Sequence, residues 1–231
     1  MGDRQSVLNQ ASPAYSKARA ALQHRELALR DMCEQVAAER RGLPAGPVLA
    51  TDYVFDEGPP DLTQNTSADF FQTRLSDLFA PGHDTLLIDH FMFGAQDKAG
   101  CPMCSMWADS YRGAVPHLAR RLSFAVVAKT DIGTLRAWAA KRGWLGLRLL
   151  SSAQTRFNAD FEMESEDGGS QFPGLSVFKK LPDGRVQHCY SQRAMYRGVE
   201  GEYRGLDIYT PLWNLLDLTP DGRGDFMPTN G

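Results

Sequence analysis

The sequence lacks several features that would place it in a specialised class of protein. Its first ten residues contain no apolar core of the kind that a secretory signal peptide needs, and no segment approaches the roughly 20 apolar residues that span a bilayer. Its 25 basic and 28 acidic residues give a net charge of −3, without the basic excess of nucleic-acid-binding proteins. We therefore expect a cytoplasmic protein that binds neither membranes nor nucleic acid.

Cysteine is scarce in this chain, with four residues at positions 33, 101, 104 and 189. In a reducing cytosol, a structural disulfide framework is not expected from so few cysteines. A close pair of cysteines there points instead to catalysis or metal binding. Cys101 and Cys104 form such a pair, and we interpret Cys33 and Cys189 as buried small hydrophobic residues.

A long helix is predicted near the N-terminus. Ser12 is a typical N-cap residue, Pro13 suits the first helical turn, and the periodic segment continues to Arg41 before Gly42 and Pro44 end it. One face carries mostly apolar residues at alternating spacings of three and four: Tyr15, Ala18, Leu22, Arg25, Leu29, Met32 and Val36. We expect this seam to be buried, either on the chain's own domain or against a second subunit in a homodimer.

The remainder of the chain divides into a connector and one α/β domain. Residues 46–84 are rich in Pro, Gly, Asp and Thr, with a strand candidate at 53–55 and a short helix that places Phe71, Leu75 and Leu78 on one face. From residue 85 to 231, apolar strands alternate with helical segments, which favours parallel strands covered on both faces. A hairpin around Pro182–Gly184 follows, and a C-terminal helix is expected near 212–218. Residues 1–45 form the predicted helical arm.

The segment Gly100–Cys104 carries the chemistry that the sequence offers. It lies between the strand ending at Phe93 and a helical run, so Cys101 is expected at a helix N-terminus, where backbone amides favour a thiolate. Cys104 follows one helical turn later, close enough to form a small disulfide. These positions predict that Cys101 attacks a substrate and that Cys104 resolves the intermediate.

Zinc binding is the main alternative for this cysteine pair, because a C-x-x-C motif supplies half of a tetrahedral site. The second half is missing. His188 and Cys189 are adjacent on a predicted strand, so their side chains point to opposite faces and do not turn toward one metal. We therefore expect no metal, and no organic cofactor is implied.

Several motifs together resemble a mainly bacterial thioredoxin-like family, catalogued as a domain of unknown function and described as predicted dithiol–disulfide oxidoreductases. The similarity to this bacterial family spans roughly residues 15 to 223. The core more distantly resembles peroxiredoxins. It implies a thioredoxin-like α/β fold with the long N-terminal arm and the C-terminal helix as additions. The segments that carry the similarity are 84–94, CPMCS at 101–105, 142–144, 149–152, 158–161, PGLSVF at 173–178 and 216–220.

This resemblance also implies roles for residues outside the dithiol. A cis-proline opens the strand beside the cysteines in thioredoxin-like folds and receives the substrate, a position matched by Phe172–Pro173. Thioredoxins carry a buried acid on the strand that enters the site. Asp89 or His90 occupies that place depending on the register, and His90 is the residue we expect to act on the thiolate.

The function that these observations favour is thiol–disulfide exchange with a disulfide-bearing protein or a small thiol. Met103 and Trp107 surround the dithiol and are candidates to join Phe172 and Pro173 in contacting the substrate, with core packing as the favoured interpretation of Trp107. A thiol peroxidase is the second enzymatic hypothesis. A redox-inert thioredoxin-fold binding or scaffold protein is the hypothesis from a different class.

Overall fold

The computed structural model describes residues 11–195 and 207–230, and the contacts divide the chain at Pro44 into two compact units. The first unit contains helix α1, Pro13–Arg41. The Ser12 side chain accepts a hydrogen bond from the Tyr15 amide at 3.2 Å, and Pro13 occupies the first turn. The predicted helix is therefore confirmed, with its expected start and end.

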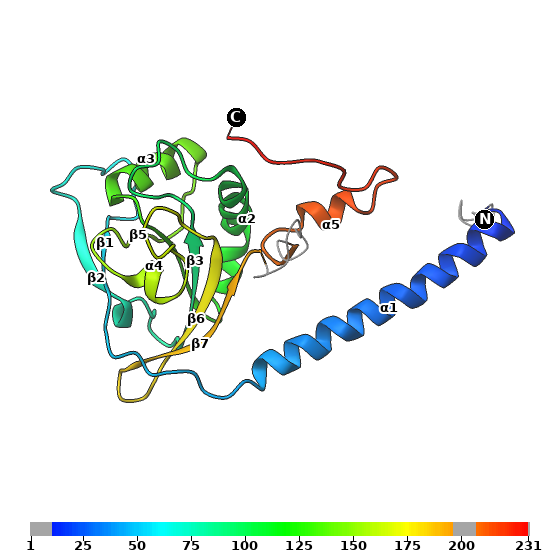
Figure 1. The fold of residues 1–231 in the computed structure, drawn as a ribbon, viewed down its shortest axis with the longest axis horizontal. Coiled ribbons are helices and arrows are strands. Elements are labelled where there is room, and N and C mark those ends of the chain that lie inside the picture. The colour runs from blue at the N-terminus through cyan, green and yellow to red at the C-terminus, as the bar shows by residue number, and fades with distance from the viewer. Residues whose placement is uncertain (1–10, 196–206, 231) are drawn as a thin grey trace, which may run out of the picture. The chain divides into compact units, whose positions relative to one another are not determined.

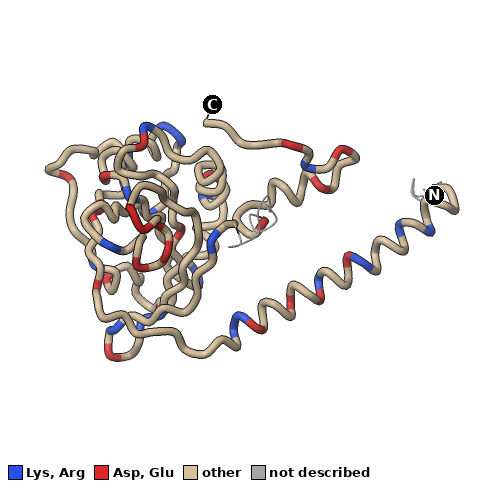
Figure 2. The backbone as a smooth tube through the Cα atoms, viewed as in Figure 1, with Lys and Arg blue, Asp and Glu red and all other residues tan. Residues whose placement is uncertain are grey.

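Within its own unit, the apolar seam of α1 is exposed. No residue of the helix is buried, and Leu22 and Leu29 are 52% and 66% exposed. A narrow seam of this spacing suits a partner helix. Burial of the seam, on the chain's own domain or against a second subunit, stays a prediction. Figure 2 shows charges of both signs interspersed along α1, among them the ion pairs Arg19–Glu26 and Arg30–Asp31.

The second unit is built on one seven-stranded sheet (Figure 1). Its order is β2-β1-β5-β4-β3-β6-β7, and the three central strands β5, β4 and β3 are parallel, as the alternating pattern predicted. The other strands pair in antiparallel fashion, so the sheet is mixed. The strand bounds are Val54–Glu57 (β1), Phe71–Arg74 (β2), Thr85–Phe91 (β3), Ser123–Ala128 (β4), Leu149–Ser151 (β5), Gly174–Lys180 (β6) and Val186–Arg193 (β7).

The predicted short helix around Phe71 is wrong. Residues Phe71–Arg74 form β2 on β1, and only the turn η2, Leu75–Asp77, is helical. Leu75 and Leu78 do pack in the core, but Phe71 is 48% exposed, so the spacing of three apolar residues mimicked a helix face. Pairing with β1 satisfies the backbone hydrogen-bonding groups of this segment, and this outweighs the helix-like spacing of its apolar residues.

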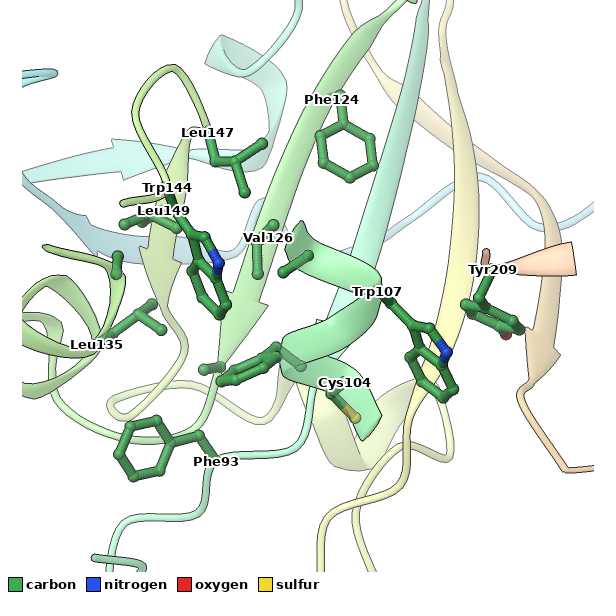
Figure 3. Packing of buried hydrophobic residues seen from close by; sticks show 14 of the residues in the cluster. Phe93, Cys104, Trp107, Phe124, Val126, Leu135, Trp144, Leu147, Leu149 and Tyr209 are labelled. Atoms are coloured by element: carbon green, nitrogen blue, oxygen red, sulfur yellow. The ribbon is translucent and has the colours of Figure 1, made fainter. Parts of the chain in front are cut away.

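Two hydrophobic clusters cover the two faces of the sheet. Helices α2 (Pro102–Leu118) and α3 (Ile132–Arg142) pack on the face that includes Phe91 and Phe93 of the β3 region, together with Trp144 (Figure 3). The other face carries Leu86 and Ile88 of β3 against η2 and the short helix α4, Phe157–Asp160. The C-terminal helix α5, Leu212–Leu216, contributes the buried Trp213 to the first cluster.

A buried arginine fixes the connector to this domain. Arg136 of α3 is 2% exposed and donates hydrogen bonds to the main-chain carbonyls of Pro59, Asp61 and Gln64 at 2.6–2.9 Å. Its guanidinium supplies several donors in one plane, which matches three carbonyls of an irregular loop. The Pro- and Gly-rich segment is therefore held in one conformation.

The edge strand β7 is partly covered by the chain that precedes β1. The Leu49 amide donates to Val186 O, and the His188 amide donates to Pro47 O. Gly46 lies so close to this strand that a Cβ atom there would stand 2.2 Å from His188 O. Only glycine permits this approach.

Candidate active site

The loop before α2 places Cys101 at the carboxyl end of β3. The Cys101 amide donates to Met92 O at 2.9 Å, and the Asp97 carboxylate accepts from the Gly94 amide at 2.7 Å. A Cβ atom at Gly100 would stand 2.5 Å from the Phe91 ring, so glycine is required directly before the cysteine. Cys101 itself is the N-cap of α2, and Pro102 occupies the first turn, which is the predicted arrangement.

The environment of Cys101 favours its thiolate. The donor character of the neighbouring Cys104 thiol, and that of the Cys104 and Met103 amides, lowers the pKa of Cys101 to about 6, against the opposing effect of burial. These amides belong to the first turn of α2, where they have no partner within the helix. Cys101 is partly exposed, so a substrate can reach the sulfur.

Cys104 has the opposite properties. It is 1% exposed and packs in the cluster beside Trp107 (Figure 3). Burial raises its pKa well above the ordinary value, and the hydrogen bond to Cys101 and the negative charge of Asp89 raise it further. One thiol of the pair is thus a poised nucleophile, and the other is held protonated.

A buried carboxyl group lies behind Cys104. Asp89 of β3 is 1% exposed, and burial raises its pKa to about 8, with an opposing contribution from the Tyr111 hydroxyl. Neither the two Asp89 oxygens nor the Tyr111 hydroxyl has a hydrogen bond of ordinary geometry. A carboxyl group in such surroundings can exchange a proton with a neighbour near neutral pH.

His90 does not belong to this site, contrary to the prediction that placed it there. Alternation along β3 puts Asp89 on the face of α2, as it does Leu87 and Phe91, and directs His90 to the opposite face with Leu86 and Ile88. The His90 ring stacks on Phe157 of α4 at 5.3 Å and bonds to Ser176. The register of β3 thus places Asp89, and not His90, on the face of the sheet that carries the two cysteines.

Pro173 directly precedes β6, the neighbour of β3, and β6 begins at the pairing of Gly174 with His90. The predicted cis bond is wrong: the Phe172–Pro173 peptide is trans. The chain enters the strand already extended, because the Phe172 amide donates to Met163 O and Pro173 O accepts from the Ala194 amide. The position of the proline therefore agrees with the expected framework, but its isomer does not.

The other predicted substrate contacts differ in exposure. Met103 and Phe172 are half-buried, and Arg193 lies over the Phe172 ring at 4.0 Å. Trp107 is fully buried and stacks on Tyr209 with ring centroids 4.5 Å apart, so the expectation that it contacts a substrate is wrong (Figure 3). Its role is core packing.

Three features of the site were missed by the sequence analysis. Tyr111 follows Cys104 by seven residues, two helical turns, and this spacing could have placed it on the buried face of α2. The Trp138 indole donates to Ser105 Oγ at 3.2 Å, and the Asn230 amide donates to Gly100 O at 3.0 Å. No sequence signal connects these distant residues to the dithiol.

Within residues 11–195 and 207–230, no group of three or more His, Cys, Asp or Glu side chains is arranged to hold a metal ion. Over the same part of the chain, no helix has the length and apolar character needed to cross a membrane.

The sheet order, with the cysteines between the parallel strands β3 and β4, defines a thioredoxin-like protein. The chain belongs to the family described as "Bacterial protein of unknown function (DUF899)", whose model matches residues 4–230. No curated protein matches the sequence. The resemblance stated from the motifs is therefore confirmed.

One solved structure supports the same fold. The 1-Cys peroxiredoxin described as an antioxidant protein of Plasmodium falciparum shares 12% identity at a TM-score of 0.51, over 76% of this chain and 98% of that one. At this identity the similarity shows the fold alone. Two further structures are similar at lower TM-scores. A putative thioredoxin reductase from Burkholderia cenocepacia shares 14% identity at a TM-score of 0.49, over 72% and 96% of the two chains, and AhpC of Enterococcus faecalis shares 14% identity at a TM-score of 0.48, over 80% and 98%.

Proposed function

We propose that this protein is a thiol–disulfide oxidoreductase in which Cys101 attacks and Cys104 resolves. The observation that carries the proposal is the contrast between the two thiols: Cys101 has a pKa of about 6 and is accessible, whereas Cys104 is buried with a raised pKa. A reactive cysteine is a thiolate in a partly exposed, electropositive setting, and a resolving cysteine need not be either.

The proposed reaction has two exchange steps. The Cys101 thiolate attacks one sulfur of a substrate disulfide, forms a mixed disulfide and releases the other sulfur as a thiolate. Cys104 then loses its proton and attacks the Cys101 sulfur, which releases the second substrate thiolate and leaves a Cys101–Cys104 disulfide. The substrate gains two electrons and the dithiol loses them, so an external thiol must reduce the pair for turnover.

Asp89 is the group that we assign to the second step. Its charge affects Cys104 when it is ionised, and a pKa of about 8 leaves a minor carboxylate fraction at neutral pH that can accept the Cys104 proton when the thiol becomes a nucleophile. Because Asp89 acts through Cys104 and not on the substrate, it is a positioning residue. We assign Met103, Phe172 and Pro173 to substrate docking, and a disulfide-bearing protein or a small disulfide as the substrate.

The test is reduction of insulin and of glutathione disulfide with dithiothreitol as the donor. Cys101→Ser should abolish exchange, and Cys104→Ser should accumulate a mixed disulfide visible on a non-reducing gel and by mass spectrometry. Cys189→Ser is the matched control, because this cysteine is partly buried at a distance from α2 in the sequence and in the sheet. Exchange that survives in Cys101→Ser would refute the proposal. Turnover of hydrogen peroxide without disulfide exchange would assign a thiol peroxidase instead, and bound zinc with unreactive thiols would assign a scaffold.

A further inference from the structure

A second cavity lies in the same unit, on the face of the sheet opposite the dithiol. It encloses about 550 Å³ and shares no lining residue with the thiol site. Pockets for small molecules have volumes of roughly 300–1,000 Å³ and are mostly apolar with a few directed polar groups. Its apolar walls are formed chiefly by Leu49, Tyr53, Phe161, Met163 and Met195.

The aromatic walls of this cavity are fixed by contacts behind them. The Phe161 ring packs edge-on against Tyr53 at 6.0 Å and against Phe178 at 5.1 Å. The Tyr53 hydroxyl donates to Asp160 at 2.8 Å. A flat ring system is therefore the shape that these walls accept best, since edge and face contacts with aromatic side chains are available without rearrangement.

A β-bulge directs two polar side chains into the cavity. The pairing of β6 with β7 shifts at Cys189, because Phe178 faces His188 whereas Val177 faces Tyr190. In a regular strand, His188 and Ser191 would point to opposite faces, since they are three residues apart. With one residue extra, both lie on one face, and His188 Nε2 is 2.8 Å from Ser191 Oγ.

These two residues end a buried hydrogen-bonded chain that the dithiol chemistry does not use. Ser191 Oγ lies 2.7 Å from Ser176 Oγ, which lies 2.8 Å from His90 Nε2. Ser176 and His90 are 0% and 1% exposed, and His90 Nδ1 has no partner. Burying polar groups costs free energy unless they are hydrogen-bonded, and the hydrogen bonds that offset this cost lead from His90 in the core to the cavity wall.

The hydrogen-bonding capacity of Ser191 defines what the cavity binds. A serine hydroxyl donates once and accepts twice, and Ser191 has two partners in the chain. When Ser176 donates to Ser191 and Ser191 donates to the neutral His188 ring, one acceptor position remains on Ser191, and the ligand that matches this arrangement carries a donor. Burial lowers the pKa of His188, which keeps the ring neutral at pH 7.

The charges around the cavity do not favour an anion. Asp160 and Glu162 contribute carboxylates, and the basic residue Arg193 donates to Glu162 O and lies over the Phe172 ring. We infer that this cavity is a binding site for a neutral aromatic molecule that donates one hydrogen bond, from a hydroxyl or ring N–H group, to Ser191. The site is independent of the proposed thiol chemistry.

The test measures the binding of 2-naphthol to the full-length protein by calorimetry and by saturation-transfer NMR. Binding to the unmodified protein is expected, with weaker binding of 2-methoxynaphthalene, which has no donor, and of anionic 2-naphthoate. Ser191→Ala should weaken 2-naphthol binding roughly two- to tenfold, the effect of one lost hydrogen bond. Leu49→Trp should weaken binding by narrowing the cavity, and Cys101→Ser should leave binding unchanged.

Three results would overturn the inference: no binding of 2-naphthol to the folded protein, equal affinity in Leu49→Trp, or tighter binding of the methoxy compound. The Leu49→Trp variant keeps the test valid if Ser191→Ala does not fold, because Leu49 is a half-buried wall residue outside the hydrogen-bonded chain. Disulfide exchange by Ser191→Ala should equal that of the unmodified protein, which separates this site from the proposed function.

Discussion

The reactivity of Cys101 should depend on the thiol one turn away. Hydrogen bonding from the Cys104 side chain is the largest cause of the lowered Cys101 pKa, ahead of the two amides. With a pKa of about 6, roughly 90% of Cys101 is thiolate at pH 7, against a few per cent for an ordinary cysteine. Cys104→Ala removes the donor and should raise the pKa, while Cys104→Ser keeps a hydroxyl donor and should raise it less.

The assay is the rate of iodoacetamide alkylation between pH 4 and pH 10, in protein that also carries Cys33→Ser and Cys189→Ser. The rate should reach half its maximum near pH 6 in Cys104→Ser and at a higher pH in Cys104→Ala. Cys104 in the Cys101→Ser protein should react slowly at every pH at which the protein is folded, because it is buried. A midpoint near 8.5 in both Cys104 variants would refute the reasoning, since it would mean that neither the neighbour nor the helix amides act on the sulfur.

Three further predictions concern stability and assembly. Because burial raises the Asp89 pKa in the folded state, the native protein binds more protons than the unfolded chain between pH 4 and pH 8. Its free energy of unfolding should therefore fall with rising pH by up to about 1.4 kcal/mol per pH unit. Urea unfolding of Asp89→Asn should lack this slope, and an equal pH dependence in the variant and the unmodified protein would contradict the prediction. Sedimentation equilibrium should show a dimer that Leu22→Lys together with Leu29→Lys converts to a monomer; a monomeric unmodified chain would exclude assembly through α1. Arg136→Met should lower the free energy of unfolding by about 2–5 kcal/mol, because three buried carbonyls lose their donor, and a loss below about 1 kcal/mol would show that water replaces it.

The central part of the fold was predictable because each element carries its own signal. The parallel strands are short apolar runs separated by helices with clear caps, such as Asp131 before α3 and Gly143 after it. β2 carried no such signal. Its four residues have one buried side chain. They form a strand only because β1 supplies the partner, which lies 14 residues earlier at the nearest pairing, Glu57 with Phe71.

In the candidate site, too, some features follow from local residues and others depend on distant parts of the sheet. The position of Cys101 at the start of a helix follows from local residues, and so does the burial of Cys104. The choice between Asp89 and His90 does not, because a shift of one residue in a strand exchanges its two faces. β3 is buried on both faces, so its composition carries no alternation that would fix the register.

The segment around Pro47 and Leu49, which lies beside β7, limits aggregation between copies of this protein. An open sheet edge is a template for pairing with another polypeptide, and long, flat, apolar edges promote aggregation. Here Pro47 and Leu49 use main-chain groups of β7 that would otherwise be available, and the bulge at Cys189 interrupts the regular ladder. At the other edge, β2 has four residues and ends in Arg74. Neither edge of the described sheet thus offers a long, regular template for a second chain, which limits aggregation through strand pairing.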